Sequence, residues 1–248
     1  KANGITTRTK GWEIALDLNP VRTENFRWHV NLNWGTFKEY LEKVYTAEDG
    51  TEVTNLDRVK VGERIDQYWI RDFMRTPDGQ LIVGDDGKPI VDTYYSKIGY
   101  ANPDWAAGIT NNISYKNVSL DFTFDGRYGG KILNYVNKKL WQSGRHTDSD
   151  NPERANDVQE IKSYVTDGVV VTGGELTRDG EGNVISDTRT YAQNTTKMYY
   201  QDYAKSYHGN DAANIIDKTF AKLREVTLSY NLPSSAFKNM GIDKMSIS

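Results

Sequence analysis

Residues 26–34 read Phe-Arg-Trp-His-Val-Asn-Leu-Asn-Trp, and this run decides the fold. Every second side chain is apolar, and the positions between them hold Arg, His and Asn. Such alternation is typical of a β-strand with one apolar and one polar face, because successive side chains point to opposite sides. A helix would instead bury Arg27 or His29 among the aromatic rings. The sequence therefore predicts a long strand whose apolar face begins and ends in large aromatic side chains.

The dimensions of this strand fit a membrane. Nine strand residues tilted by about 40° rise about 20 Å, and the apolar band of an outer-membrane barrel is about 25 Å high with aromatic residues at both borders. A strand in a soluble antiparallel sheet, with its polar face in water, has the same alternation. Periodicity alone leaves both interpretations open.

The composition excludes several classes of protein. The chain has 248 residues and a net charge of −3, so it lacks the basic surface typical of a nucleic-acid-binding protein. No run of about 18 apolar residues occurs, which excludes a transmembrane helix but not membrane strands. The absence of cysteine excludes disulfides, zinc–thiolate sites and thiol nucleophiles. The chain starts at Lys1 without Met and stops inside a strand pattern, so we expect a piece of a longer protein.

Four further segments alternate in the same way, namely residues 10–18, 107–115, 118–124 and 222–232. The first is predicted to form a hairpin with residues 26–34, because the connection 19–25 contains turn formers such as Pro20. After the last, residues 234–241 read as a short turn of helix, and another strand starts at residue 243.

A second hairpin has a two-residue turn at Lys116-Asn117, where Asn tolerates the left-handed conformation that such turns need. This turn length fixes the register, so that Tyr115 faces Val118 and each following pair is set. Asn111 is then the single polar residue on the apolar face of this hairpin.

Two very long connections interrupt the alternation, at about residues 42–102 and 128–218. Short strands are predicted at 68–74 and 81–83, and a short helix near 157–164. Connections of this length exceed ordinary loops, so we expect them to carry function or structure of their own.

The strand directions place the short connections at one end of the sheet and the two long ones at the other. Outer-membrane barrels have this asymmetry, with short periplasmic turns and long extracellular loops. The sequence thus favours an all-β fold, an antiparallel transmembrane β-barrel segment. The inward face would carry Glu13, Asp17, Arg27, His29, Asp121, Asp125 and Glu225. By parity with Val226, we expect Lys222 and Arg224 on the outward face near the extracellular rim.

Several motifs resemble the carboxy-terminal half of SusC/RagA-type TonB-dependent transporters of Bacteroidetes. They are Gly11-Trp12-Glu13-Ile14, Phe26-Arg27-Trp28, Ala101-Asn102-Pro103-Asp104-Trp105 followed by Gly108, Ser114-Tyr115-Lys116-Asn117, Phe124-Asp125-Gly126-Arg127-Tyr128-Gly129-Gly130, and residues 222–233. Their order and spacing match the family along nearly the whole chain.

This resemblance implies that residues 1–248 are part of one receptor barrel domain of 22 strands in the bacterial outer membrane, without the plug and the terminal strands. It implies a non-enzymatic importer of oligosaccharides or oligopeptides. The partners would be a SusD-like lipoprotein, outer-membrane lipid and, through the absent plug, TonB. No cofactor and no nucleic-acid partner is expected.

Candidate ligand-binding residues are Trp69, Trp105 and Trp141, which we expect to be exposed in the long connections and able to stack on sugars. Packing within the loops accounts for them equally well. We expect no catalytic residue, because the three His are far apart in sequence and Asp121 and Asp125 suit a wet lumen wall. No metal is expected, because the acidic residues of 83–92 lack the Asp-x-Asp-x-Asp-Gly spacing of a calcium loop.

An alternative function is a soluble β-rich carbohydrate-binding or adhesion module. It would show the same alternation and exposed aromatic residues. A requirement for detergent distinguishes the two, since only the barrel segment should need it.

Overall fold

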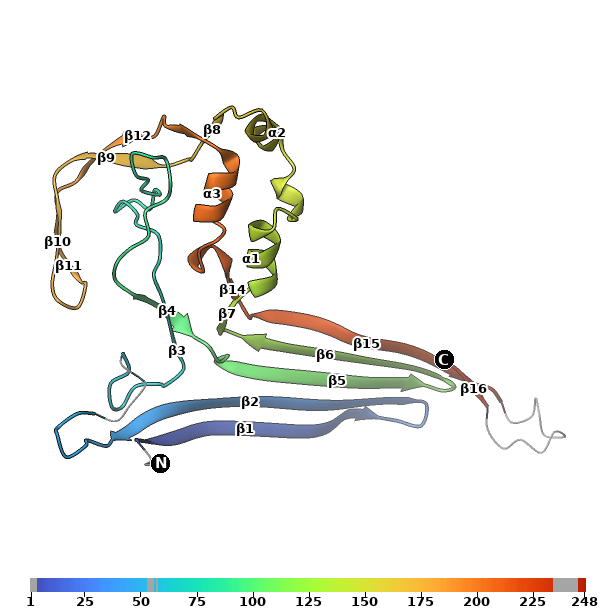
Figure 1. Cartoon of the computed structure of the whole chain (residues 1–248). Helices are drawn as coiled ribbons and strands as arrows, with labels where there is room; N and C mark the ends of the chain where they lie inside the picture. The colour runs from blue at the N-terminus through green and yellow to red at the C-terminus, as the bar shows by residue number, and fades with distance from the viewer. Residues whose placement is uncertain (1–3, 53–55, 57, 234–244) are drawn as a thin grey trace. The chain divides into compact units, whose positions relative to one another are not determined.

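The computed structural model describes residues 4–52, 56, 58–233 and 245–248 (Figure 1). The chain divides into two compact units. Unit 1 comprises Lys1–Gln67, Tyr100–Gly130 and Asp217–Ser248, and unit 2 comprises Tyr68–Gly99 and Lys131–Ile216.

Unit 1 is built on one six-stranded antiparallel sheet (Figure 1). In spatial order its strands are β1 (Ile5–Arg22), β2 (Phe26–Val44), β5 (Trp105–Tyr115), β6 (Val118–Tyr128), β15 (Phe220–Asn231) and β16 (Ser246–Ile247). The predicted antiparallel β-structure is therefore confirmed. The sheet is open and does not close into a barrel, since β1 and β16 are its two edges among the described residues. The helical turn predicted at residues 234–241 lies outside them.

The first hairpin is longer than its alternating pattern, because β1 continues through Pro20 to Arg22. The pairing with β2 shifts between Leu18 and Val21, which leaves Pro20 at an irregularity of the strand. A proline has no N–H to donate to a sheet, and such bulges are among the few places where a strand tolerates it. The loop predicted at 19–25 is thus too long, because residues 19–22 belong to β1.

The register of the second hairpin matches the prediction. Tyr115 pairs with Val118 and Asn111 with Phe122, without a shift along the two strands. The left-handed turn residue is Lys116, with φ 52°, and not Asn117 as the sequence suggested.

The parity prediction for Lys222 and Arg224 is wrong. The pairing of β15 with β6 shifts between Leu223 and Glu225, so Arg224 occupies a bulge and Lys222 pairs with Asp125 on the polar face. The Arg224 guanidinium also donates two hydrogen bonds to the Asp125 carboxylate. One extra residue reverses the alternation, and it takes both cations off the apolar face.

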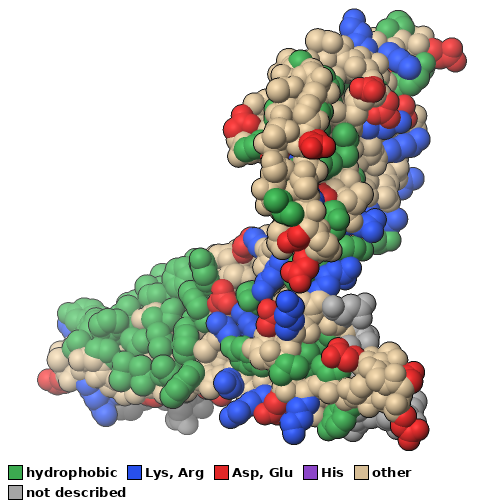
Figure 2. All heavy atoms as spheres, turned by 90° about the vertical axis from the view of Figure 1, so that its left-hand side faces the viewer, with side chains coloured by type: hydrophobic (Ala, Val, Ile, Leu, Met, Phe, Trp, Pro, Cys, Tyr) green, Lys and Arg blue, Asp and Glu red, His purple; other side chains and the backbone are tan. Residues whose placement is uncertain are grey.

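Cross-strand pairing makes one face of the sheet apolar (Figure 2). One row across it consists of Leu16, Leu32, Ile109, Phe124 and Leu223, and the next row of Leu18, Val30, Asn111, Phe122 and Val226. The Nε1–H of Trp28, two residues along β2, donates to the Oδ1 of Asn111 at 3.1 Å. The one polar side chain in these two rows is therefore hydrogen-bonded from within the same face.

Aromatic side chains border this apolar face at both ends of the strands. Trp105 and Tyr128 pair at one end of the β5–β6 hairpin, and their rings stack with centroids 5.9 Å apart. Tyr115 closes the other end of β5, and Tyr230 lies at the same level on β15. The ten-residue step from Trp105 to Tyr115 spans about 34 Å along the strand, or about 26 Å for a strand tilted by about 40°.

The remaining strands are short and pair two by two. They are β3 (Gln67–Ile70) with β4 (Ser96–Tyr100), β7 (Lys131–Leu133) with β14 (Ile215–Asp217), β8 (Tyr164–Val165) with β13 (Lys197–Met198), β9 (Val169–Gly173) with β12 (Thr190–Gln193), and β10 (Leu176–Arg178) with β11 (Val184–Asp187). The strand predicted at 68–74 is present only as β3, and residues 81–83 form single bridges instead of a strand.

Unit 2 also contains short helices, α1 (Tyr135–Gln142), α2 (Pro152–Val158), α3 (Tyr200–Ser206), η1 (Thr147–Ser149) and η2 (Ala212–Asn214). The helix predicted near 157–164 is wrong, because α2 begins at Pro152 and ends at Val158. The Asn151 side chain caps its start, and proline suits a first helical position. No helix in the described part of the chain has the length and apolar character needed to cross a membrane.

Aromatic stacking forms the core around α1 and α3. The indole of Trp141 stacks with two imidazoles, with its centroid 3.6 Å from that of His208 and 4.4 Å from that of His146. Trp141 and Tyr200 are buried, and Tyr203 packs beside them. Burial, together with the nearby His146, lowers the pKa of His208 to about 4, so its ring is neutral at neutral pH.

Trp28→Phe should destabilise unit 1 beyond the loss of ring area. It removes the donor to Asn111, which is only 7% exposed, and an unsatisfied buried acceptor costs about 1–3 kcal/mol. Denaturant unfolding in detergent measures this change. The double variant Trp28→Phe/Asn111→Leu should recover part of the loss, because it also removes the unsatisfied acceptor. A double variant no more stable than Trp28→Phe would contradict this account.

The stability of unit 2 should fall as the pH drops from about 6.5 towards 4. Over this range the unfolded chain protonates His208, whereas the folded state, with its pKa near 4, does not. Hydrogen exchange of the α1 and α3 amides measures the local opening. His208→Phe keeps a flat ring against Trp141 and should reduce the pH dependence, whereas His29→Gln in unit 1 should leave it unchanged. An undiminished pH dependence in His208→Phe would contradict the assignment.

Candidate functional site

Both long connections leave the same end of the sheet. The first runs from the end of β2 at Val44 to Trp105 at the start of β5, and the second from Tyr128 of β6 to Phe220 of β15. Trp105 pairs with Tyr128, and the neighbouring pairs of β2–β5 and β6–β15 continue the same rows. The two long connections therefore lie at one end of the sheet and the short turns at the other, as predicted from the sequence.

A buried arginine joins two segments of unit 1 at this end of the sheet by hydrogen bonds to Asp66 and Asp104. Arg64 is 6% exposed, donates two hydrogen bonds to Asp66 at 2.9 and 2.8 Å, and donates one to Asp104 at 3.1 Å. Its guanidinium lies 3.8 Å from the ring centroid of Tyr100. Burial acts to raise the pKa of Asp66, but the hydrogen bonds from Arg64 and from the Asn102 amide outweigh it and lower the pKa.

Two motifs that carry the family resemblance meet at this end. Gly129 and Gly130 have φ of +78° and +83°, which favours glycine. A Cβ on Gly129 would lie 2.8 Å from the Asp104 carboxylate, and one on Gly130 would lie 3.1 Å from the backbone of residues 101–103. The glycines therefore permit a close approach of the two connections where they join the sheet.

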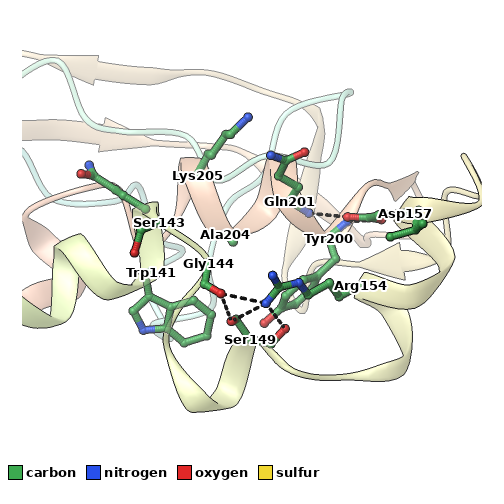
Figure 3. Close-up of a pocket in the computed structure, with 12 residues that line it drawn as sticks. Trp141, Ser143, Gly144, Ser149, Arg154, Asp157, Tyr200, Gln201, Ala204 and Lys205 are labelled. Carbon is green, nitrogen blue, oxygen red and sulfur yellow. Dashed lines mark hydrogen bonds between the residues drawn. The ribbon is translucent and has the colours of Figure 1, made fainter.

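Unit 2 contains a pocket of about 420 Å³ between its helices (Figure 3). Its lining consists of Trp141, Gln142, Ser143, Gly144, Ser149, Arg154, Asp157, Val158, Tyr200, Gln201, Ala204 and Lys205. Trp141, Tyr200 and Ala204 are buried side chains of α1 and α3. The pocket thus combines buried aromatic surface with polar groups from α2 and α3.

Asp157, the single carboxylate of the lining, joins α2 to α3. Its two oxygens accept hydrogen bonds from the backbone N–H of Tyr200 at 2.9 Å and of Gln201 at 2.7 Å (Figure 3). The N-cap residue of α3, Tyr199, offers no capping side chain. Asp157 therefore satisfies amides that the first turn of α3 would leave without partners.

The two cations of the pocket keep hydrogen-bonding capacity for a ligand. Arg154 uses only Nη1, which donates to the carbonyl of Gly144 at 2.8 Å and to the hydroxyl of Ser149 at 3.0 Å (Figure 3). Among the described residues, neither its other two nitrogens nor the Lys205 ammonium has a hydrogen-bond or ion-pair partner. Such donors suit a carboxylate, and the aromatic surface suits an apolar or ring-bearing portion of the same ligand.

The structure separates the three tryptophans singled out in the sequence. Trp141 is 8% exposed, so its predicted exposure is wrong, although it lines the pocket. Trp105 is the first residue of β5 and lies on the apolar face of the sheet. Trp69 is half-buried in β3 and does not line the pocket.

Sequence reasoning missed Arg154, Ser149 and Lys205. The only local signal was the Asn-Pro pair at 151–152, which is typical of a helix start and places Arg154 in the first turn of α2. The separation of His146 and His208 in sequence gives no sign of a contact, whereas the structure stacks both imidazoles with Trp141.

On the polar face of the sheet, three of the aspartates contact neighbouring side chains. Asp121 accepts a hydrogen bond from Asn112, and Asp125 is paired with Arg224. His29 lies 3.6 Å from Asp17 across the β1–β2 hairpin.

No protein-family model matches the chain. Two curated relatives do, both from Formosa agariphila. TonB-dependent receptor P3 is 24% identical over 168 residues, which is 57% of this chain, and TonB-dependent receptor P26 is 28% identical over 152 residues, which is 50% of it. The chain spans only 17% and 15% of the length of these two proteins.

The fold resembles part of a solved transporter. A chain of the RagAB peptide importer in its closed-closed state matches 99% of this chain with a TM-score of 0.55 and 12% identity. A second structure of the RagAB peptide transporter matches 98% with a TM-score of 0.50 and 12% identity. This chain spans 26% of the length of either one. The resemblance read from the sequence motifs is therefore confirmed: the chain is a partial homologue of TonB-dependent receptors, and its fold matches part of a SusC/RagA-type transporter.

Proposed function

We propose that this chain forms part of the barrel wall and the extracellular loops of an outer-membrane TonB-dependent importer of oligomers. The observation that carries the proposal is the two-faced sheet. Its apolar face has aromatic borders about 26 Å apart, close to the apolar band of about 25 Å on outer-membrane barrels. Both long connections leave one end of this sheet, as extracellular loops would.

A soluble binding module fits the sheet poorly. In a soluble protein the apolar face of a sheet packs against a second layer. Here Trp12 remains 77% exposed, Leu228 64% and Val226 56%, although all three belong to the apolar face. A contiguous apolar surface of this kind needs lipid or a further protein layer, and the aromatic borders favour lipid.

Oligopeptides are the substrate class that the pocket favours. One neighbour with a matching fold is a peptide importer, and every oligopeptide with a free C-terminus has a carboxylate for Arg154. Lys205, whose side chain points away from Arg154 in Figure 3, adds a second positive charge to the lining of the pocket. A neutral glycan would leave both cations without an anion. Of the tryptophans predicted from the sequence to bind ligand, only Trp141 lines the pocket, and its ring is already stacked with His146 and His208. Trp105 we assign to the membrane border instead, because it lies on the apolar face.

The long connections would also meet the other components of the importer. We assign residues 42–102 and 128–218 to the face that contacts a SusD-like lipoprotein lid, and transport energy to TonB through a plug outside this chain. In this role the chain binds and guides its substrate and performs no covalent chemistry.

Arginine substitutions on the two faces of β15 test the membrane assignment. Val226→Arg should cost about 2–4 kcal/mol in lipid if its site is near the bilayer midplane, whereas Thr227→Arg on the polar face should cost little. Unfolding of the whole protein in lipid vesicles measures both. Since Val226 is 56% exposed, the same change in a water-exposed sheet would be almost neutral. Equal costs at the two positions would reject the membrane wall.

Uptake of defined peptides tests the pocket. In cells that carry the intact transporter, Arg154→Gln/Lys205→Gln should reduce uptake of oligopeptides with a free C-terminal carboxylate about tenfold, the range expected for a charged hydrogen bond. Uptake of the corresponding C-terminal amides should change little. The matched variant Arg145→Gln/Lys139→Gln removes two cations outside the pocket lining and should keep normal uptake. Equal uptake by the two double variants would exclude the pocket from substrate binding.

A further inference from the structure

A group of cations lies on the outward face of β1 and β2, just past its aromatic border. Lys10 pairs directly with Lys38, and the preceding row pairs Arg8 with Tyr40. In both strands these residues have the parity of the apolar positions, since Lys10 is two residues from Trp12 and Lys38 is four from Trp34. All four side chains therefore belong to the face that carries the apolar residues.

This arrangement is electrostatically unfavourable by itself. Directly opposed side chains of an antiparallel pair have Cβ atoms about 5 Å apart, and like charges there destabilise the sheet. Two carboxylates offset part of the charge. Glu42 lies 4.0 Å from Arg8, and Asp104 lies 3.7 Å from Lys38 but is shared with the buried Arg64.

Lys10 has no carboxylate partner among the residues that the structure describes. Its ammonium lies 5.4 Å from the ring centroid of Tyr40, and its side chain is exposed. The group therefore has excess positive charge centred on the Lys10–Lys38 pair.

The position of this pair fits the headgroup layer of a bilayer. Two strand residues correspond to about 6.6 Å, which a tilt of about 40° reduces to a rise of about 5 Å above Trp12. The headgroup layer on each side of the hydrocarbon core is about 5–7 Å thick. Cations at this height cost little in a membrane, and they lie at the end of the sheet from which the long connections leave.

We propose that Arg8, Lys10 and Lys38 bind the phosphate of a lipid headgroup in the leaflet on the side of the long connections. The inference rests on the proposed membrane position of the sheet. A phosphate carries enough negative charge and enough acceptor oxygens to bridge opposed ammonium groups and a guanidinium at once. The hydroxyl of Tyr40 supplies a further donor in the same row. A lipid phosphate is already concentrated at this height, which a free phosphate is not.

The test uses the whole purified protein in zwitterionic nanodiscs with an increasing fraction of diphosphorylated lipid A. Native mass spectrometry should detect retained lipid A on the unmodified protein, and Lys10→Gln/Lys38→Gln should reduce retention at least fivefold. The matched control is Arg22→Gln/Arg27→Gln, which removes another directly opposed cation pair from the same two strands. That pair lies at the other end, with Arg27 on the polar face, so lipid retention should not change. Lys10→Arg/Lys38→Arg keeps the charge and should retain lipid.

Thermal unfolding supplies a second readout, because lipid A should reverse the difference in unfolding temperature between Lys10→Gln and the unmodified protein. In lipid-free zwitterionic detergent, Lys10→Gln should unfold at the same or a higher temperature than the unmodified protein, because it relieves repulsion. With lipid A present the order should reverse. An unchanged order, equal retention of dephosphorylated lipid A, or equal stabilisation by inorganic phosphate would each overturn the proposal.

Quenching of Trp12 fluorescence by brominated lipid, measured as the signal that the unmodified protein has and Trp12→Phe lacks, distinguishes the membrane position of the sheet from the lipid site. No quenching would place the sheet outside the bilayer and overturn both the proposed function and the lipid site. Quenching without a preference for phosphorylated lipid would overturn the lipid site alone.

Discussion

The register of the antiparallel pairs is the constraint on which the rest of the structure depends. Because side chains alternate with a period of two, a slip by one residue would exchange the apolar and polar faces. The two-residue turn at 116–117 fixes the register of β5–β6, and the pairs Trp28–Ile113 and Phe122–Val226 extend it to the neighbouring strands. Asn111 tolerates its place in the apolar row because this register puts the Trp28 indole within hydrogen-bonding distance.

The two irregularities of the long strands keep unsuitable groups out of that pattern. At 18–21 a shift accommodates a proline that lacks a donor, and the apolar positions resume at Val21. At 223–225 the extra residue turns Lys222 and Arg224 towards Asp125 and returns Leu223 to the row of Phe124. Both irregularities preserve the polarity of the faces at the expense of regular pairing, as expected where an apolar face must remain free of charge.

Much of the sheet could be predicted from the sequence, because alternation and turn length are local properties. The β5–β6 register followed from two turn residues, and the sorting of connections followed from counting strand directions. The bulge at Arg224 was not predictable from parity, since one inserted residue leaves no mark in the alternation of residues 226–232. The site was mostly hidden from the sequence. The pocket joins Ser149 of the three-residue helix η1 with Arg154 and Lys205 of two seven-residue helices, and the stack at Trp141 uses histidines 62 residues apart.

Two groups of cations among the described residues have different physical roles. Arg64, Arg189 and Arg224 each form two hydrogen bonds with a carboxylate of their own unit, which fixes local geometry. Arg154, Lys205 and Lys10 lack any carboxylate partner among the described residues. Exposed cations of this kind cost little in water, so a single one has no meaning by itself. Their positions differ from an ordinary solvated surface, however, because two of them line a pocket with an aromatic wall and the third faces another lysine across a strand pair at the border of an apolar surface. In both places the geometry leaves the charge unbalanced where an anion from outside the chain can reach it.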